Sequence, residues 1–236
     1  MYFGRDQNPL KPSHLNPLFI VASISGLLIG LWILGRRTFA FRLFRMSSPA
    51  NQPTLKTGRY FFSSDLKKPK RLDFICYRAL TPATGPTLFT HRVCGLPGDI
   101  IEIRAGNLYI NKQDADHDLS LMHVYKMPVK DISGVVYDKT LSYTLPPYPD
   151  TVYAPLDDEY VRVKALPFIR YVLPPGLRDE AIFTVYRKNW NQDHFGPVKV
   201  PAGKFFVLGD NRGNSMDSRY QGMIDQSKYA GTVLWK

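Results

Sequence analysis

The chain has 236 residues and a formal net charge of +11, from 31 lysines and arginines against 20 aspartates and glutamates. Its apolar and charged fractions, 44% and 22%, are ordinary for a folded protein and argue against a disordered chain. A basic balance is typical of proteins that bind nucleic acid or an anionic membrane surface. Because no zinc-ligand spacing, helix-turn-helix pattern or ribonucleoprotein motif accompanies the basic residues, the sequence favours the membrane and indicates no nucleic-acid partner.

An uncharged apolar run occupies residues 17–35, after a short tail of residues 1–16. As a helix rising about 1.5 Å per residue it would measure roughly 30 Å, one bilayer hydrocarbon core. A cleaved signal peptide usually has a shorter apolar stretch of about 7–15 residues and then small residues, whereas Arg36 and Arg37 follow this one. The run therefore predicts a retained transmembrane anchor, with a buried core helix as the alternative.

After the anchor the chain reads as mostly β, because short apolar segments separated by turns replace any long helical periodicity. In the first segment, residues 37–44, the apolar Phe39, Phe41 and Leu43 alternate with other residues and would share one face of a strand. At Leu96-Pro97-Gly98-Asp99 a type II turn is expected. The further expected strands are residues 72–77, 91–95, 100–103, 108–111, 204–212 and 230–235.

The middle of the chain, residues 112–197, differs from the flanking sequence because it contains short proline-rich segments such as LPPYP and LPPG. Such a stretch is either an inserted β-rich domain or a set of long loops. We expect an insert between the two halves of a β core, residues 36–111 and 198–236. The two cysteines, Cys76 and Cys94, could form one bridge outside the cytoplasm or serve as two buried apolar side chains.

The densest polar motif is GDNRGNSMDSR at residues 209–219, directly after the apolar FFVL. It holds two Asp, two Arg, two Ser and two Asn within eleven residues. Asp217 and Arg219 are two residues apart, so in an extended chain their side chains share a face and could pair. By itself the motif fits a functional loop or a hydrogen-bonded structural loop.

Three motifs together resemble the type I signal peptidase family of membrane-anchored serine proteases. The 209–219 motif is similar to the family pattern Gly-Asp-Asn-Arg, two residues, Ser, one residue, Asp-Ser-Arg. HRVCGLPGD at 91–99 is similar to Lys-Arg-Val-x-Gly-x-Pro-Gly-Asp, and MSSPANQPTLKTG at 46–58 to Ser-Gly-Ser-Met-x-Pro-Thr-Leu-x-x-Gly. The shorter stretches RTFAF and RLDFICY also match. The resemblance covers the two core segments, residues 36–111 and 198–236. The insert matches no motif and corresponds only in its position to the family's second, smaller domain. The resemblance implies two antiparallel β-sheet domains.

The resemblance implies a serine nucleophile whose proton is taken by a neutral lysine, or by a histidine in one branch of the family. The nucleophile position falls three residues before Pro53, at Ala50, and the base position falls at His91. No cofactor or metal is implied. The supporting positions are Ser48 for the oxyanion, Ser215 for orienting the base, and Asp217 with Arg219 for the acid and its salt-bridge partner.

Ala50 is the departure from the family pattern with the largest chemical consequence, because a methyl group cannot attack a carbonyl. In a comparable triad the loss of the serine costs roughly 10⁶ in turnover. Pro49 replaces the usual Gly, removes an N–H and favours an extended Ser48, and Asn51 replaces the usual Met. Assigning the nucleophile to Ser47 or Ser48 instead breaks the match to the following Pro-Thr-Leu.

The sequence therefore predicts a chain that recognises signal peptides or pilin-type precursors but is catalytically impaired. Two alternatives stay open. One is an active serine endopeptidase for signal peptides, or for pilin in a conjugation system, in which Ala50 is an introduced change; the other is a non-enzymatic envelope assembly scaffold. The expected partners are signal peptides or precursor proteins, the membrane lipid surface, and secretion or pilus assembly machinery.

Two arguments disagree about location. The basic residues after the anchor, Arg36, Arg37, Arg42 and Arg45, outnumber those before it and favour a cytoplasmic folded domain. The resemblance places that domain on the outer, periplasmic face of a bacterial inner membrane, where signal peptides emerge. Because the charge rule is a statistical bias and each arginine near anionic lipid can gain about 1 kcal/mol, we expect a single-pass protein with residue 38 onward outside.

Overall fold

The computed structural model describes residues 16–37, 41–81, 85–145 and 148–235. The chain separates into two units, residues 1–38 and 39–236. The described part of the first unit is dominated by one helix, α1 (Pro17–Arg37). Its first 18 residues have a mean hydropathy of 2.3, so α1 is long and apolar enough to cross a membrane; within the described residues no other helix is.

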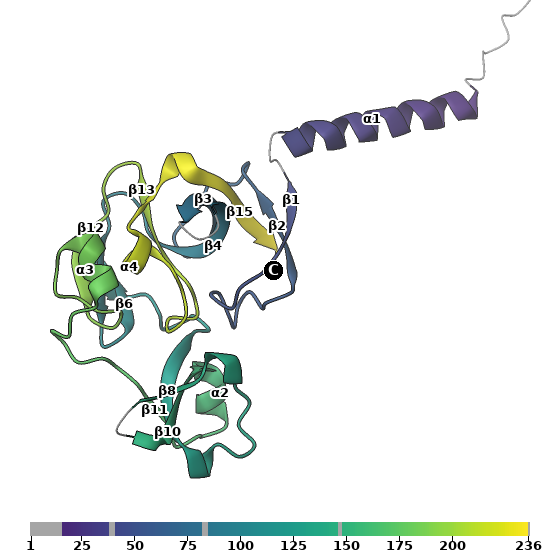
Figure 1. The fold of residues 1–236 in the computed structure, drawn as a ribbon. Coiled ribbons are helices and arrows are strands. Elements are labelled where there is room, and N and C mark those ends of the chain that lie inside the picture. Colours follow the sequence, from purple (N-terminus) through teal and green to yellow (C-terminus); the bar gives the residue numbers. More distant parts are fainter. Residues whose placement is uncertain (1–15, 38–40, 82–84, 146–147, 236) are drawn as a thin grey trace, which may run out of the picture. The chain divides into compact units, whose positions relative to one another are not determined.

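The second unit is built from antiparallel sheets, which confirms the mostly β prediction (Figure 1). Its largest sheet has seven strands in the order β1-β2-β15-β3-β4-β13-β14. These strands are β1 (Arg42–Arg45), β2 (Tyr60–Ser64), β3 (Phe74–Thr81), β4 (Gly85–Gly95), β13 (Lys204–Leu208), β14 (Ile224–Asp225) and β15 (Tyr229–Trp235).

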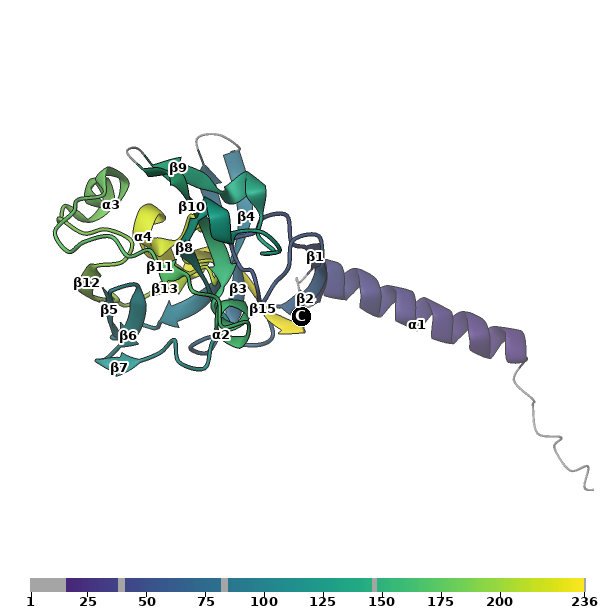
Figure 2. The same ribbon diagram turned by 90° about the horizontal axis from the view of Figure 1, so that it is seen from below.

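Two four-stranded sheets complete the unit. The first, in the order β12-β5-β6-β7, consists of β5 (Ile100–Arg104), β6 (Asn107–Ile110), β7 (Gln113–Asp114) and β12 (Phe195–Lys199). The second, in the order β11-β8-β10-β9, consists of β8 (Met122–Pro128), β9 (Tyr143–Leu145), β10 (Tyr148–Asp157) and β11 (Ile169–Arg170). In Figures 1 and 2 this second sheet and α2 (Asp158–Val163) form a lobe beside the strands of the largest sheet. The remaining helices are short: α3 (Glu180–Tyr186), α4 (Ser218–Gln221), η1 (Val129–Asp131), η2 (Lys139–Leu141) and η3 (Gln226–Lys228).

Residues with positive φ stand in two turns that the sequence predicts. Gly98, with φ +94°, follows Pro97 in the turn that links β4 to β5. Ala105 and Gly106, with φ +47° and +77°, close the β5–β6 hairpin as a two-residue turn whose twist suits antiparallel strands. The Ala105-Gly106 turn brings β6 back beside β5, as the sequence predicts.

The observed strand limits differ from the predicted ones at several places, and the strand predicted over 72–77 runs instead from Phe74 to Thr81 as β3. The 37–44 segment begins as β1 only at Arg42, and Phe39 lies outside the described residues; Phe41 and Leu43 are both exposed, as expected for one face. β4 starts six residues before the predicted 91, because its whole length from Gly85 pairs with β3. The strand predicted over 204–212 ends at Leu208, where the polar GDNR residues leave the sheet.

Both cysteines are free and buried in the described structure, so they do not form a bridge. Cys76 packs in a cluster with Met46, Leu55 and Phe61, whereas Cys94 belongs to a different cluster around Phe206. Burial raises the pKa of the Cys94 thiol to about 12, so that thiol behaves as a small apolar side chain.

Candidate functional site

A groove of about 510 Å³ opens on the largest sheet of the second unit. It is bounded by the segment from the end of β1 to residue 50, by β2, by residues 87–91 of β4 and by the loop after β13. The residues that line it are Phe44, Arg45, Met46, Ser47, Ser48, Pro49, Ala50, Phe61, Thr87, Leu88, Phe89, Thr90, His91, Asn214 and Met216. Three of the residues singled out from the sequence, Ser48, Ala50 and His91, therefore share one cavity.

The loop that carries Ala50 is fixed by hydrogen bonds to two other segments. The Asn51 side-chain amide donates to the Thr90 carbonyl at 2.6 Å, and Asn51 is fully buried. The Asn211 backbone N–H donates to the Ala50 carbonyl at 3.0 Å, and the Asn211 side chain donates to the Pro49 carbonyl at 3.3 Å. The position of Ala50 is thus set by the middle of β4 and by the loop after β13.

His91 is a buried imidazole, 2% exposed, with a partner on each ring nitrogen. Nδ1 lies 2.8 Å from the Tyr77 hydroxyl, and Nε2 lies 3.2 Å from Ser215 Oγ. Burial lowers the pKa of His91 to about 4, with Asp217 acting in the opposite direction. The ring is therefore neutral at pH 7, the protonation state that a general base requires.

Asp217 and Arg219 form a fully buried ion pair whose charges act on His91. Arg219 Nε and Nη2 donate to the two Asp217 carboxylate oxygens, both at 2.9 Å, and their side chains are 1% and 0% exposed. Asp217 is also the N-cap of α4 and accepts from the Gly209 backbone N–H at 3.1 Å. Burial by itself raises the pKa of Asp217, but Arg219 outweighs this and the pKa lies below its usual value. The two side chains pair as predicted, across a helix cap instead of along an extended strand.

Two further buried ion pairs were missed by the sequence analysis. Arg92 forms a bidentate pair with Asp210, with Nε–Oδ1 at 2.7 Å and Nη2–Oδ2 at 2.5 Å, and Thr54 hydrogen-bonds the same carboxylate. Arg212 forms a second bidentate pair with Asp116, at 2.6 and 2.7 Å. The sequence offered one signal for these pairs: Arg92 stands inside an apolar strand, and Asp210 and Arg212 stand in the polar motif. Both pairs join segments that are far apart in the sequence to the loop after β13.

Tyr77 is the other contributor that sequence reasoning missed. It stands on β3, where Tyr77 pairs with Phe89 and Ile75 with His91. Tyr77 and His91 are therefore diagonal neighbours on one face of the sheet, a spacing that an aromatic side chain can bridge. No spacing in the sequence reveals this contact, because it depends on the register of the two strands.

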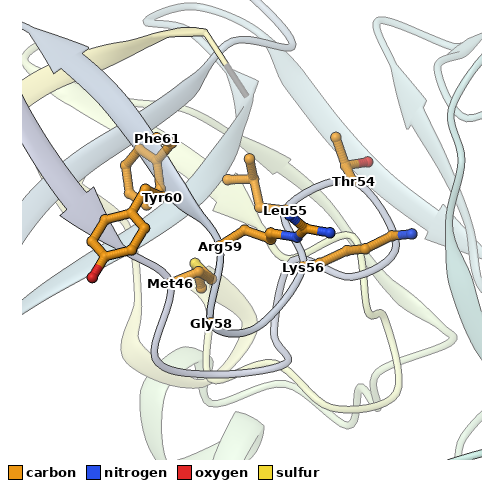
Figure 3. Close-up of a pocket in the computed structure, with 8 residues that line it drawn as sticks. All are labelled: Met46, Thr54, Leu55, Lys56, Gly58, Arg59, Tyr60 and Phe61. Carbon is orange, nitrogen blue, oxygen red and sulfur yellow. The ribbon is translucent and has the colours of Figure 1, made fainter.

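A second cavity, of about 600 Å³, adjoins the groove and shares Met46 and Phe61 with it. Figure 3 shows Tyr60 and Phe61 at one end of this cavity and Thr54 and Lys56 at the other, with Arg59 between them. Its lining contains two basic side chains and no acidic one. In the described parts of the chain no group of three His, Cys, Asp or Glu side chains lies in an arrangement that could hold a metal.

Comparisons with known proteins give one consistent result. The model of the family described as "Signal peptidase, peptidase S26" matches residues 19–236. Signal peptidase I of Aquifex aeolicus is 28% identical over 220 residues, which cover 88% of this chain and 79% of that protein. A probable signal peptidase I-2 of Synechocystis is 25% identical over 208 residues, which cover 85% of this chain but only 65% of that longer protein.

Shorter and structural matches name the same kind of protein. A 39-residue stretch is 67% identical to signal peptidase I of Bacillus licheniformis and covers 16% of this chain and 21% of that one. A crystal structure of a signal peptidase I from Enterococcus faecalis has a TM-score of 0.36 and 24% sequence identity over 71% of this chain and 98% of that chain. Since the family model spans nearly all of the sequence, this chain belongs to the signal peptidase family, peptidase S26, and within it to the type I signal peptidases.

Proposed function

We propose that this protein recognises signal peptides or pilin-type precursors at the membrane surface and is catalytically impaired, because Ala50 occupies the position of the nucleophilic serine. The observation that carries the proposal is a formed groove in which His91 and Ser48 are in place and the side chain at position 50 is a methyl group. Binding and oxyanion stabilisation do not need the nucleophile, so they can persist when turnover falls by roughly 10⁶.

The walls of the groove support the binding of an extended apolar peptide. β13 pairs with β4 only at Arg92, Val93 and Gly95, so on that side Leu88 to Thr90 have no strand partner among the described residues. An open strand edge can accept a peptide as an added strand, with side-chain pockets providing selectivity. Apolar side chains line the groove that this edge borders; they are Phe44, Phe61, Leu88, Phe89 and Met216.

The test uses the full chain in detergent with a radiolabelled pre-protein that carries a photo-crosslinker beside its cleavage site. We expect crosslinking without cleavage at pH 6, 7, 8 and 9. Leu88→Arg, inside the groove, should abolish the crosslink. Leu80→Arg is the matched control, because Leu80 lies on the neighbouring strand, is 79% exposed and is not part of the groove.

Each alternative predicts a different outcome of the same experiment. Cleavage that disappears in His91→Ala would identify an active protease and overturn the proposed impairment. Cleavage that persists in His91→Ala would remove both the assigned site and its mechanism. Absence of any specific crosslink, together with absence of cleavage, would favour a scaffold that uses the β fold only as a structural part.

The proposed location is the bacterial inner membrane, with α1 as the single span and the second unit on the periplasmic face. The exposed Phe41 and Leu43 of the segment that follows α1, and the basic cavity with Lys56 and Arg59, support a lipid surface as a further partner. Secretion or pilus assembly machinery is proposed as a partner on the basis of the precursors such a protein would meet. No cofactor enters the proposed function.

A further inference from the structure

The hydrogen bonds around His91 determine which of its two nitrogens carries the proton. Tyr77 is fully buried, and in the described structure its hydroxyl has one hydrogen-bond partner, His91 Nδ1 at 2.8 Å. A phenol can donate one hydrogen bond, and a neutral imidazole has one donor and one acceptor nitrogen. The contact is therefore either O–H···Nδ1 or Nδ1–H···O.

The two arrangements differ in whether the buried phenol proton of Tyr77 has an acceptor. If Nδ1–H donated to the Tyr77 oxygen, the phenol proton would be buried without an acceptor, at a cost of about 1–3 kcal/mol. If the phenol donates to Nδ1, the phenol proton and the imidazole proton both have a partner, because Nε2–H can then donate to Ser215 Oγ at 3.2 Å. Burial raises the pKa of Tyr77 well above its usual value, so the phenol keeps its proton at any working pH.

We propose that Tyr77 is a positioning residue that fixes His91 as the Nε2–H tautomer, so that the imidazole presents a proton, not a lone pair, to Ser215 and the Ala50 side of the site. The hydrogen bonds then run in one direction, from Tyr77 to His91 to Ser215. The Ser215 hydroxyl proton remains available to donate to a group lying beside Ala50. A general base must present a lone pair to the hydroxyl that it activates, so this arrangement is a second obstacle to catalysis, separate from the missing serine.

The inference rests on the proposed function only in treating His91 as the residue at the base position; the tautomer itself can be measured directly. The full chain, with ¹⁵N-labelled histidine rings, is studied by NMR in detergent micelles at pH 7. Because the chain has five histidines, the spectrum of a His91→Gln variant identifies the His91 signals. We expect a neutral ring with the proton on Nε2. A proton on Nδ1, or a charged ring, would overturn the inference.

Variants separate the effect of Tyr77 from that of its neighbours. Tyr77→Phe removes the donor to Nδ1, and we expect the ¹⁵N shifts of the two ring nitrogens to move toward each other as the tautomers mix. Ser215→Ala should leave the proton on Nε2. Tyr186→Phe is the matched control, since Tyr186 is a partly buried phenol that donates to the Ser218 carbonyl at 2.6 Å and does not touch His91. A tautomer that changes in Ser215→Ala and not in Tyr77→Phe would contradict the assignment.

An activity measurement separates this inference from the proposed function. Ala50→Ser restores a hydroxyl to the nucleophile position, yet we expect no measurable cleavage of a pre-protein at pH 7, because Nε2 already carries a proton. Efficient cleavage by Ala50→Ser would overturn the tautomer argument and leave the impairment of the Ala50 protein intact. Failure of the unmodified chain to bind a precursor would remove the proposed function and leave the NMR result unaffected.

Discussion

The ionisation of His91 is governed by its removal from water. His91 is in contact with Tyr77 and Ser215 and is influenced by the Asp217 and Asp210 carboxylates, which raise its pKa, and by Arg219, which lowers it. Burial outweighs all of these, and the pKa falls from 6.5 to about 4. Folding therefore requires a neutral ring at this position.

The first prediction is a dependence of stability on pH that becomes weaker in His91→Gln; a part remains, because burial also lowers the pKa of His123. The pKa of His91 is lower in the folded than in the unfolded chain, so its contribution is fully present above pH 6.5 and is lost as the pH falls toward 4. The loss amounts to at most about 3 kcal/mol. Urea unfolding of the full chain in detergent at several pH values measures it.

The control for this prediction is His117→Gln, because the His117 side chain is 66% exposed. This variant should reproduce the pH dependence of the unmodified chain. If His91→Gln loses stability between pH 6.5 and 4 as steeply as the unmodified chain does, the buried neutral imidazole is not the cause.

The second prediction concerns the buried ion pair of Asp217 and Arg219. Arg219→Ala leaves a carboxylate without its partner in a fully buried position, which typically costs about 3–5 kcal/mol. The melting temperature should fall by about 10 °C. Arg178→Ala is the matched control: Arg178 also pairs with an acid two residues away, Glu180 at 2.6 Å, but the two side chains are 46% and 72% exposed. An exposed pair contributes about 0–1 kcal/mol, so equal effects of the two variants would contradict the predicted burial.

At the scale of elements, the site depends on how closely the loop after β13 approaches the loop that carries Ala50. A Cβ added at Gly209 would overlap the Ala50 carbonyl oxygen and Ser215 Oγ. The Asn211 backbone N–H donates to that same carbonyl. The absence of a side chain at Gly209 therefore sets the distance between the two loops.

The third prediction is that Gly209→Ala weakens precursor crosslinking as well as stability. The added methyl group meets backbone that is held by hydrogen bonds, so the Ala50 loop must move, and the overpacking costs about 1–3 kcal/mol. Gly95→Ala is the control, because its Cβ would lie 2.8 Å from Val200 and 2.9 Å from Ile101, in the core and outside the groove. Gly95→Ala should lower the melting temperature and leave crosslinking unchanged. Equal crosslinking by both variants would show that the loop spacing does not shape the groove.

At the scale of the whole molecule, the positive charge and the apolar helix determine how the chain meets a membrane. The net charge of +11 includes arginines directly after the apolar run, and Arg42 and Arg45 lie on β1. Basic side chains at that point in the sequence suit either the cytoplasmic side or an anionic lipid surface. The two readings place the second unit on opposite faces of the membrane.

The fourth prediction is that protease added to intact spheroplasts digests the folded domain. We expect a C-terminal tag to be lost and an N-terminal tag to be protected until the membrane is opened. The apolar run is long enough to remain in the bilayer, and the orientation follows the resemblance to the type I signal peptidases, because the charge rule by itself favours the opposite orientation. A C-terminal tag that is protected until lysis would reverse the topology and exclude contact with emerging signal peptides.

The sequence by itself predicted an apolar helix long enough to span a membrane and a mostly β class, which the structure confirms, and it proposed the candidate site residues. These features are local: hydrophobic length predicts the span, alternation and turn residues predict strands, and motif spacing places Ala50, His91 and Ser215. Each depends on residues that are close together in the chain, so no long-range contact had to be known.

Only the tertiary structure decided which side chains meet, and hence the chemical state of the site. The contact of Tyr77 with His91 follows from the β3–β4 register, since a shift by one residue would turn Tyr77 to the other face. The pair of Arg92 with Asp210 joins residues 118 positions apart. The pKa of His91 reflects burial by all of these neighbours together. Residue types and their spacing in the sequence indicate which side chains could form a site. The distances between these side chains, their burial and their proton positions arise only when the chain folds.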